Sequence, residues 1–295
     1  MMIMDAPTPE MCWDMIDGIL VINMDTSPQR FTSFMEQSGR YLPSDKVERL
    51  PAVAGRQLPD YGKAPWFSEK TGARAPFWGG TAGCALSHRR AIEYARQKGW
   101  RNVLILEDDA AYDAVAGAEK LLREALLQLK GDYMLYLGFN RPTPYGRKCI
   151  KGDDCAVWAI EGALATHSYL LPESMYDRLL AYLPTEDNVW EWLARYRAVD
   201  VFYRDYVSAM PGVSIYAILP VMFCQSDEKS DISGESSCGD SYTCRENPHR
   251  YTTLSGIVHL LMYPLRRLKI KANSIRTLRR ARKGGLPGYR KRKKK

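Results

Sequence analysis

Apolar residues in the first half of the chain fall into short continuous runs that are separated by longer stretches of mixed polarity. Such runs are typical of strands buried on both faces of a sheet, and they lie at residues 18–24, 103–107 and 133–138. The intervening stretches carry helix start and stop residues. Three helices are predicted. The first begins near Pro28 and ends before Gly39, the second covers 84–98 and ends before Gly99, and the third covers 114–130 and ends before Gly131. This order predicts a parallel α/β sheet with crossover helices.

The remaining segments give weaker signals. Residues 54–83 are rich in glycine, proline and aromatic residues and are predicted to form a long loop, which is a kind of segment that often carries function. The pattern after Arg141 is mixed. We expect strand pieces there, followed by a helix that starts near Pro172, a second helix over 187–197 and a late strand over 213–219.

Charge is divided unevenly along the chain. The 295 residues carry a net charge of +8, from 42 basic and 34 acidic side chains. Residues 266–295 hold 15 of the basic side chains and no acidic one, so the rest of the chain has 27 basic and 34 acidic side chains and a net charge of −7. This asymmetry indicates a tail with an anionic partner of its own, either a membrane surface or a nucleic acid.

The start of the tail has the spacing of an amphipathic helix. Its apolar positions are Leu254, Ile257, Val258, Leu261, Leu265, Leu268, Ile275 and Leu278, with a kink expected at Pro264. A basic amphipathic helix predicts a segment that binds an anionic membrane surface. One alternative is a helix packed on the body with a solvated, disordered end. The other is that the final lysines direct the protein to a nucleic acid.

The N-terminal residues do not resemble a secretory signal, because Asp5, Pro7, Pro9 and Glu10 interrupt any apolar stretch. The sequence contains no uninterrupted run of about 18 apolar residues, so a membrane-spanning helix is not predicted. The seven cysteines are an odd number in a chain too long to need disulfides. We therefore expect mostly reduced thiols and a cytoplasmic protein, peripheral to the membrane through its tail. Cys149 and Cys155 have the same spacing as Cys238 and Cys244. Two small disulfide loops, one for each pair, are therefore an alternative.

The tripeptide Glu107-Asp108-Asp109 directly follows the second apolar run. The carboxyl ends of strands form the ligand-binding edge of open α/β sheets. Three adjacent carboxylates repel one another, and a hard divalent ion such as Mg²⁺ or Mn²⁺ would relieve the repulsion. Glu107 and Asp109 point to the same side of an extended backbone, so both are candidate metal ligands. The alternative is a solvated acidic turn.

A second cluster is GGTAGCALSHRRAI at residues 79–92. Its three glycines precede the predicted helix start, and Ser87 and His88 lie in the first turns. A glycine-rich approach to a helix N-terminus suits a phosphate or a sugar hydroxyl. In the alternative interpretation the glycines form a turn, Ser87 begins the helix and His88 packs in the core.

Four motifs, taken in order, resemble glycosyltransferase family 25, which includes lipooligosaccharide and collagen-type galactosyltransferases. They are ILVINMDTSPQR at 19–30, AVAGRQL at 52–58, GTAGCALSHRRAI at 80–92 and VLILEDDA at 103–110. The last two are specific, and chance does not readily produce both in this order. The resemblance is strong over 18–138 and weaker up to residue 232. Residues 54–83 are longer and richer in tryptophan than the family pattern, and the basic tail does not align with it.

The resemblance implies an α/β fold of the GT-A-like type, with a single Rossmann-like mixed sheet flanked by helices. It also implies a nucleotide-sugar donor, UDP-galactose or a relative, and Mn²⁺ or Mg²⁺ as the cofactor. Asp109 is the expected direct metal ligand, and Glu107 supports it directly or through water. Donor contacts are then expected from Asn23, Arg30, Ser87, His88, Asp108 and Asp231.

An inverting transferase also needs a base that takes the proton of the acceptor hydroxyl. The candidate carboxylates are Asp187, Glu191, Asp200 and Asp205. We favour Asp200 as the catalytic residue, because it follows an apolar approach and matches a weakly defined aspartate of the family. The alternative is that Asp200 is an ordinary carboxylate at the start of a helix.

These observations predict a metal-dependent transferase that moves a hexose from a UDP-sugar to a hydroxyl of a glycan, a lipid-linked sugar or a protein. The alternatives are a nucleic-acid-binding protein that acts through its tail and a metal-dependent phosphoryl-transfer enzyme. The tail lacks interleaved aromatic residues apart from Tyr289, and the chain lacks a P-loop. We expect an N-terminal extension at 1–17, a transferase domain at 18–250 and a basic amphipathic tail with a disordered end at 251–295.

Overall fold

The computed structural model describes residues 12–142, 145–226 and 248–288. The strands of the main sheet are β1 (Gly18–Asn23), β2 (Val47–Pro51), β3 (Asn102–Glu107), β5 (Asp132–Gly138), β7 (Tyr145–Lys151), β8 (Ala156–Ile160), β10 (Ser168–Pro172), β11 (Val213–Leu219) and β13 (His249–Arg250). Two separate pairs are β4 (Ala110–Tyr112) with β12 (Phe223–Gln225) and β6 (Arg141–Pro142) with β9 (Ala163–Leu164). The α-helices are α1 (Pro28–Gln37), α2 (Ala75–Lys98), α3 (Ala118–Gln128), α4 (Tyr176–Leu180), α5 (Val189–Tyr196), α6 (Val199–Asp205), α7 (Leu254–Leu261) and α8 (Tyr263–Gly284).

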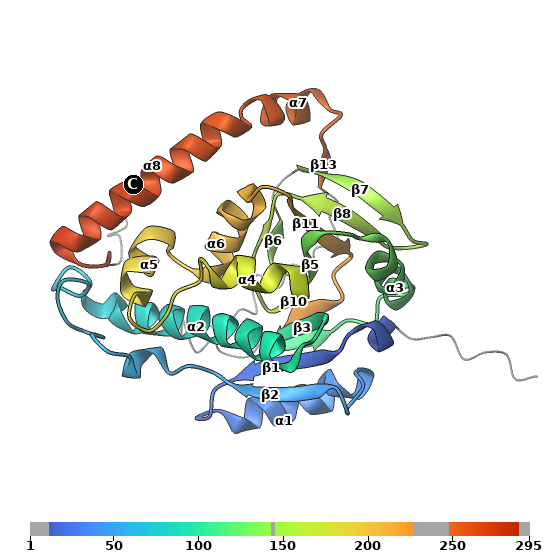
Figure 1. Ribbon diagram of the computed structural model, residues 1–295, viewed down its shortest axis with the longest axis horizontal. Helices are drawn as coiled ribbons and strands as arrows, with labels where there is room; N and C mark the ends of the chain where they lie inside the picture. The colour runs from blue at the N-terminus through green and yellow to red at the C-terminus, as the bar shows by residue number, and fades with distance from the viewer. Residues whose placement is uncertain (1–11, 143–144, 227–247, 289–295) are drawn as a thin grey trace, which may run out of the picture.

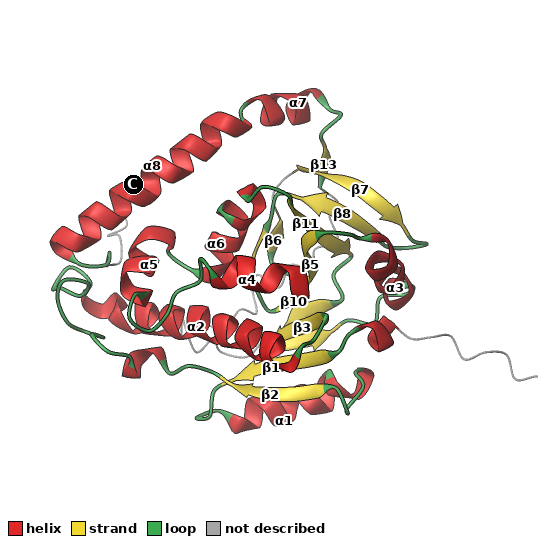
Figure 2. Ribbon diagram, in the orientation of Figure 1, coloured by secondary structure: helices red, strands yellow, loops and turns green. Residues whose placement is uncertain are grey.

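The main sheet has nine strands in the order β2-β1-β3-β10-β5-β11-β8-β7-β13 (Figure 1). Strand β10 is antiparallel to both of its neighbours, and so is β8, whereas the other seven strands run in one direction. Helices lie on both faces of the sheet (Figure 2). The expected fold class, a mixed α/β sheet flanked by helices, is confirmed.

The strand alternation divides the apolar side chains between two cores. Leu20 and Ile105 belong to a core shared with α2, α4, α5 and α6, whereas their neighbours Ile19 and Leu104 belong to a core shared with α1 and α3. Successive side chains of a strand point to opposite faces, so continuous apolar runs such as 18–22 serve both cores. The second core also holds Trp13, so the packed structure begins before Gly18.

The strands of the first half of the chain do not all have the neighbours in the sheet that their order in the sequence predicts. Strands β3 and β5 point in the same direction, as the crossover pattern predicts, but they are not paired with each other. Strand β10 returns from later in the chain and fills the gap between them, with Ser168 opposite Leu106. This insertion brings the segment before β10 next to the end of β3, where the acidic motif lies.

The predicted long loop over 54–83 is wrong in its last third, because α2 begins at Ala75 and not near Cys84. The glycines of the cluster therefore lie inside the helix. A Cβ atom on Gly83 would lie 2.3 Å from the carbonyl oxygen of Val53, and one on Gly55 would lie 2.0 Å from that of Gly79. These glycines thus allow α2 and the segment 53–55 to touch backbone to backbone, a role for glycine that overrides its low helix propensity.

The tail is helical, and its end packs on the body. Helix α8 lies along α5, and Ala281 and Leu286 are buried in the first core. Three hydrogen bonds join the residues after α8 to the segment before and within α2: Leu286 N to Trp66 O at 2.6 Å, Thr71 Oγ1 to Leu286 O at 2.7 Å, and Trp78 Nε1 to Pro287 O at 2.9 Å. The packed part of the chain thus extends well beyond Leu278.

Five cysteines are free thiols in the described part of the chain, among them Cys149 and Cys155. The disulfide loop considered for that pair is therefore absent, whereas Cys238 and Cys244 lie outside the described residues. No helix among the described residues is long and apolar enough to span a membrane.

We expect Leu286→Ala to lower the free energy of unfolding by about 2–5 kcal/mol, the usual cost of truncating a fully buried leucine. The matched control is Leu254→Ala, whose side chain is 80% exposed and whose effect should stay within about 0.5 kcal/mol. Urea denaturation followed by circular dichroism measures both. Equal, small effects of the two substitutions would show that the end of the tail is not docked.

Candidate active site

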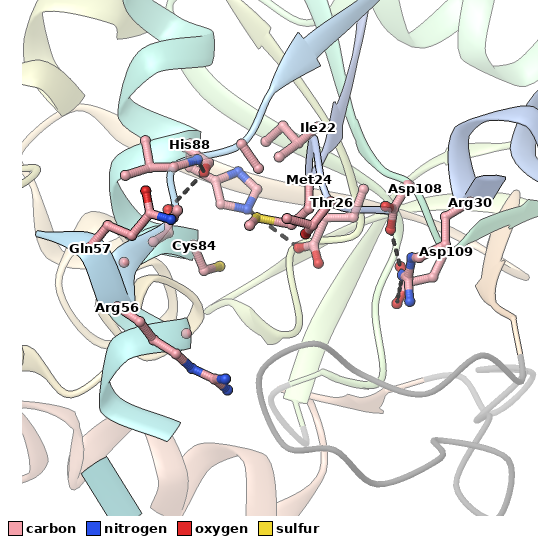
Figure 3. A pocket seen from close by; sticks show the side chains of 18 of the residues that line it. Ile22, Met24, Thr26, Arg30, Arg56, Gln57, Cys84, His88, Asp108 and Asp109 are labelled. Atoms are coloured by element: carbon pink, nitrogen blue, oxygen red, sulfur yellow. Dashed lines mark hydrogen bonds and ion pairs between the residues drawn. The ribbon is translucent and has the colours of Figure 1, made fainter. Parts of the chain in front are cut away.

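A cavity of about 370 Å³ lies at the carboxyl ends of β1 and β3 (Figure 3). These strands are parallel neighbours, so the residues that follow them meet at one edge of the sheet. The loop after β2 and the middle of α2 close the other sides. Residues that line the cavity include Met24, Thr26, Arg30, Val53, Arg56, Gln57, Cys84, Ser87, His88, Glu107, Asp108, Asp109 and Gln225.

Asp108 is enclosed by polar groups that come from the end of β1 and the first turn of α1. The side-chain amide of Asn23 donates to its Oδ2 at 2.7 Å, and Nη2 of Arg30 donates to its Oδ1 at 2.5 Å. Asn23 is buried and also accepts a hydrogen bond from Nε of Arg49 at 2.7 Å. The structure thus brings the predicted residues Asn23, Arg30 and Asp108 together, but both carboxylate oxygens of Asp108 already have partners within the protein.

Asp109 has one partnered and one unpartnered carboxylate oxygen. Nε2 of Gln225 donates to Oδ2 at 3.0 Å, and Oε1 of Gln225 in turn accepts from Asn140 at 2.8 Å. Oδ1 is buried and has no hydrogen-bond partner among the described residues. Burial, followed by the charges of Glu107 and Asp108, raises the pKa of Asp109 to about 7. A carboxylate with a free buried oxygen and a raised pKa is a suitable ligand for a cation.

Glu107 points toward α2 and the segment before β10. Its Oε1 accepts a hydrogen bond from Thr166 Oγ1 at 2.8 Å and lies 3.3 Å from Nε2 of His88. Burial raises the pKa of Glu107, but the hydrogen bond and charge of His88 and the Thr166 hydrogen bond outweigh it, so the pKa is lowered overall. Glu107 is therefore an anion that the protein itself already stabilises.

The other two predicted residues of α2 are buried in the cavity wall. His88 lies between Glu107 and Tyr169, whose hydroxyl is 2.8 Å from Nδ1. Ser87 Oγ donates to Gly83 O at 2.7 Å and accepts from Val53 N at 2.8 Å. Both side chains therefore position other groups: His88 orients Glu107, and Ser87 fastens the loop after β2 to the helix.

Asp200 lies at the start of α6, beside the same region. Its Oδ1 accepts from Val201 N at 2.7 Å and its Oδ2 from Ala165 N at 3.3 Å. Burial raises the pKa of Asp200 despite these hydrogen bonds. Burial also raises the pKa of the Cys84 thiol in the cavity wall, with further contributions from Glu107, Asp200 and Asp109. The four groups therefore share one electrostatic environment, and the predicted Asp231 lies outside the described residues.

Three residues in this region were missed by the sequence prediction. Arg56 lines the cavity with an exposed side chain and has no ion pair with any described residue. Thr166 and Gln225 each hold one carboxylate of the acidic motif. Arg56 lies in the AVAGRQL motif, so its charge could have marked it. Thr166 and Gln225 gave no local signal. Only the insertion of β10 brings Thr166 to Glu107, and only the β4–β12 pairing brings Gln225 to Asp109.

The segment before β10 connects the two ends of the site. Ala165 N donates to Asp200, Thr166 donates to Glu107, and the carbonyl of His167 accepts from Glu107 N at 3.0 Å. Ala165 has a φ of +69°, a conformation that costs free energy for a residue with a side chain and that clusters at functional sites. The strained turn at Ala165 therefore places this segment against the carboxylates of both Glu107 and Asp200.

Two sets of side chains in the cavity could hold a metal ion. The first is Asp109 with Glu107, whose oxygen atoms suit Mg²⁺ or Mn²⁺. In the second, the ligand atoms of Cys84, His88 and Glu107 lie within 4.8 Å of one another. In the second set both ring nitrogens of His88 already have partners, Tyr169 and Glu107, whereas Oδ1 of Asp109 has none among the described residues. The structure therefore fits a hard ion at Asp109 better than a soft ion at Cys84.

Comparisons with known proteins identify relatives for more than half of the chain, including the acidic motif. Residues 16–186 match the family described as glycosyltransferase family 25 (LPS biosynthesis protein). A "Glycosyltransferase 25 family member" from Drosophila pseudoobscura pseudoobscura is 30% identical over 191 residues, which are 61% of this chain and 29% of that protein. The chain therefore spans less than a third of the length of this relative.

Solved structures give only distant similarities. Mannose-1-phosphate geranyltransferase from Thermus thermophilus has a TM-score of 0.33 at 11% identity, and the match covers 68% of this chain and 73% of that one. The protein A197 from STIV has a TM-score of 0.35 at 7% identity, with 71% and 85% covered. Similarities this low support no conclusion about function.

We expect Asp109→Asn to stabilise the metal-free protein at pH 8, by about 1–4 kcal/mol, and to have little effect at pH 4. A carboxyl group whose pKa is raised in the folded state keeps its proton there while the unfolded chain loses it. Its contribution to stability therefore falls as pH rises from its usual pKa near 4 to the raised value of about 7. The asparagine cannot ionise and escapes this loss.

Urea denaturation in EDTA at several pH values measures the effect. The matched control is Asp187→Asn, which changes an exposed carboxylate. A difference between Asp109→Asn and the wild type that does not change with pH would contradict the raised pKa.

Proposed function

Because the chain belongs to glycosyltransferase family 25, we propose that its cavity binds a UDP-sugar and transfers the sugar, a hexose such as galactose, to a hydroxyl group. The acceptor hydroxyl belongs to a glycan, a lipid-linked sugar or a protein. The observation that carries this proposal is the buried Oδ1 of Asp109 at the sheet edge, which has no partner among the described residues. Family membership supports glycosyl transfer over the phosphoryl-transfer and nucleic-acid alternatives.

The cofactor in this proposal is Mn²⁺ or Mg²⁺, held by Asp109 through its free oxygen. Glu107 assists directly or through water, since its Oε1 already has two partners. Held there, such an ion would supply positive charge that offsets the negative charge developing on the leaving UDP. The fit rests on the oxygen ligands, on the buried Oδ1 atom and on the raised pKa of Asp109, which burial and then the charges of Glu107 and Asp108 cause.

The nucleotide would lie along the loops after β1 and β2. Arg30 is fixed by Asp108 and also lies 3.9 Å from Asp109, so it holds the acidic motif together and presents positive charge to the cavity. Arg56 adds a cation on the opposite side of the cavity (Figure 3). Guanidinium groups bind phosphate oxygens in a fixed geometry, and we assign the diphosphate to Arg56.

Asp200 is the proposed base. Its carboxylate would take the proton of the acceptor hydroxyl while the hydroxyl oxygen forms a bond to the anomeric carbon and the bond from that carbon to the diphosphate breaks. A raised pKa improves a carboxylate as a base near neutral pH, and burial raises that of Asp200. The competing candidates are already held in ion pairs: Glu191 binds Arg282 of the tail at 2.6 Å, and Asp205 binds Arg204 at 2.7 Å.

A donor screen tests the proposal directly. Purified protein is incubated with Mn²⁺ and a panel of UDP-, GDP- and CMP-sugars, and nucleotide release is measured. We expect slow hydrolysis of one UDP-hexose above the others, and loss of this activity in EDTA. Release from no nucleotide sugar, together with unimpaired folding, would remove the proposed reaction.

We expect Asp109→Ala to abolish transfer and the Mn²⁺-dependent part of UDP binding, because the direct metal ligand is lost. Glu107→Ala should weaken both less severely. Calorimetric titration of UDP with and without Mn²⁺ separates binding from turnover, and thermal melting checks the fold. Full activity of Asp109→Ala at saturating Mn²⁺ would exclude the assigned ligand.

We expect Asp200→Asn to lower turnover by roughly two to four powers of ten, the usual range for loss of a general base. UDP binding should survive, because the base faces the acceptor. Glu191→Gln and Asp205→Asn are the controls, since both carboxylates are engaged in ion pairs with arginine side chains. If a control variant loses turnover and Asp200→Asn keeps it, the base is wrongly assigned although the reaction class stands.

A further inference from the structure

Exposed apolar side chains are concentrated in the tail. Among the described residues, nine of the twelve large hydrophobic side chains that are exposed lie between residues 254 and 275. Five of them recur at steps of three or four and form what we call the apolar face: Leu254, Val258, Leu261, Leu265 and Leu268, which are 80%, 50%, 73%, 57% and 64% exposed. Apolar side chains that are exposed together in this way mark an interaction site.

The apolar face is carried on a support that is fixed at both ends. At one end Glu161 binds His259 at 2.8 Å and Arg266 at 3.2 Å. At the other end Leu286 is buried in the core and hydrogen bonded to Trp66. Helices α7 and α8 therefore form a rim at the outside of the molecule (Figure 1). The two anchors hold the apolar face on this rim, outside the core.

A basic face continues the same helix. Lys269, Arg276, Arg280 and Lys283 are exposed and follow one another at steps of seven, four and three, which places them on one side of α8. None of the four forms an ion pair with a described residue. With Arg279 and Arg282, three of them line a shallow hollow in the surface of α8. Arg282 in this hollow is paired with Glu191, but Lys269, Arg276, Arg280 and Lys283 present positive charge that no described acidic residue offsets.

We propose that α7 and α8 form a docking surface for an anionic lipid bilayer. The apolar face enters the boundary between headgroups and acyl chains, and the basic face binds the negatively charged headgroups. A nucleic acid would use the cations and leave the leucines in water, whereas an apolar partner would use the leucines and not need the cations. The net charge of −7 before residue 266 keeps the rest of the protein off the same surface.

Deleting the tail does not test this proposal cleanly, because Ala281 and Leu286 are part of the core. Substitutions of exposed side chains test it more cleanly, since these side chains are not part of the core. The apolar variant is Leu254→Ser with Val258→Ser and Leu261→Ser, and the charge variant is Arg276→Gln with Arg280→Gln and Lys283→Gln. The matched controls are Leu127→Ser, which changes an exposed leucine of α3, and Arg40→Gln with Lys120→Gln and Lys130→Gln, which changes three exposed basic residues elsewhere.

The experiment is co-sedimentation of the full chain with vesicles of phosphatidylcholine alone or mixed with phosphatidylglycerol, at low and high salt. We expect the wild type and both controls to bind the anionic vesicles and to be released by salt. Binding should weaken roughly tenfold or more in the apolar variant and by about two powers of ten in the charge variant. Thermal melting should be unchanged in both.

Three results would overturn the proposal. The first is equal binding of the wild type to neutral and anionic vesicles, or binding to neither. The second is a loss in the control variant that lacks Arg40, Lys120 and Lys130 equal to that in the charge variant, which would assign binding to total charge. The third is a concentration-dependent dimer that the apolar variant abolishes and that binds no lipid, which would assign the apolar face to a second copy of the chain. The readout is binding alone, so failure here leaves the proposed reaction untouched.

Discussion

Repulsion among the three carboxylates at the end of β3 is the constraint on which the site depends. The fold resolves it in a different way for each residue. Asp108 is neutralised by Arg30 and the amide of Asn23. Glu107 is stabilised by His88 and Thr166, which lower its pKa. Asp109 keeps a buried oxygen that no described residue partners, and burial together with the charges of Glu107 and Asp108 raises its pKa, so we assign this carboxylate to the metal.

Several unusual features of the fold serve this arrangement. The glycines of α2 let the loop after β2 approach the helix backbone, and Ser87 fastens that loop beside the cavity. The strained Ala165 turns the segment before β10 so that it reaches both Glu107 and Asp200. Each feature is costly in isolation, and each brings a polar group to within hydrogen-bond distance of a carboxylate or to the wall of the cavity.

The tail connects the site with the surface of the molecule. Its end packs against Trp66 and Trp78, and Trp78 lies on the same helix as Ser87 and His88. A rim that is anchored in this way fixes the orientation of the cavity relative to whatever the tail binds. For an acceptor carried by a lipid, a fixed orientation holds the acceptor hydroxyl and the donor in one geometry, which lowers the entropic cost of bringing them together.

The sequence by itself determined strands β1, β3, β5 and β11, most of the helices and the place of the acidic motif, because burial patterns and helix stop signals are local. Continuous apolar runs located β1, β3 and β5, and Gly99 ends α2 as predicted. The sequence also determined the asymmetry of charge and the amphipathic spacing of the tail. The family motifs identified Asn23, Arg30 and Asp108 as members of one site, and the structure joins them.

Tertiary structure decided what depends on segments that are far apart in the chain. Helix α2 runs through a glycine-rich stretch because close packing against residues 53–55 outweighs helix propensity. Strand β10 enters between β3 and β5, which supplies Thr166 and separates strands that the local order would pair. Leu286 joins a core that its local sequence does not predict. Local sequence cannot encode these outcomes, because the free energy that selects them comes from contacts that form only when the whole chain is folded.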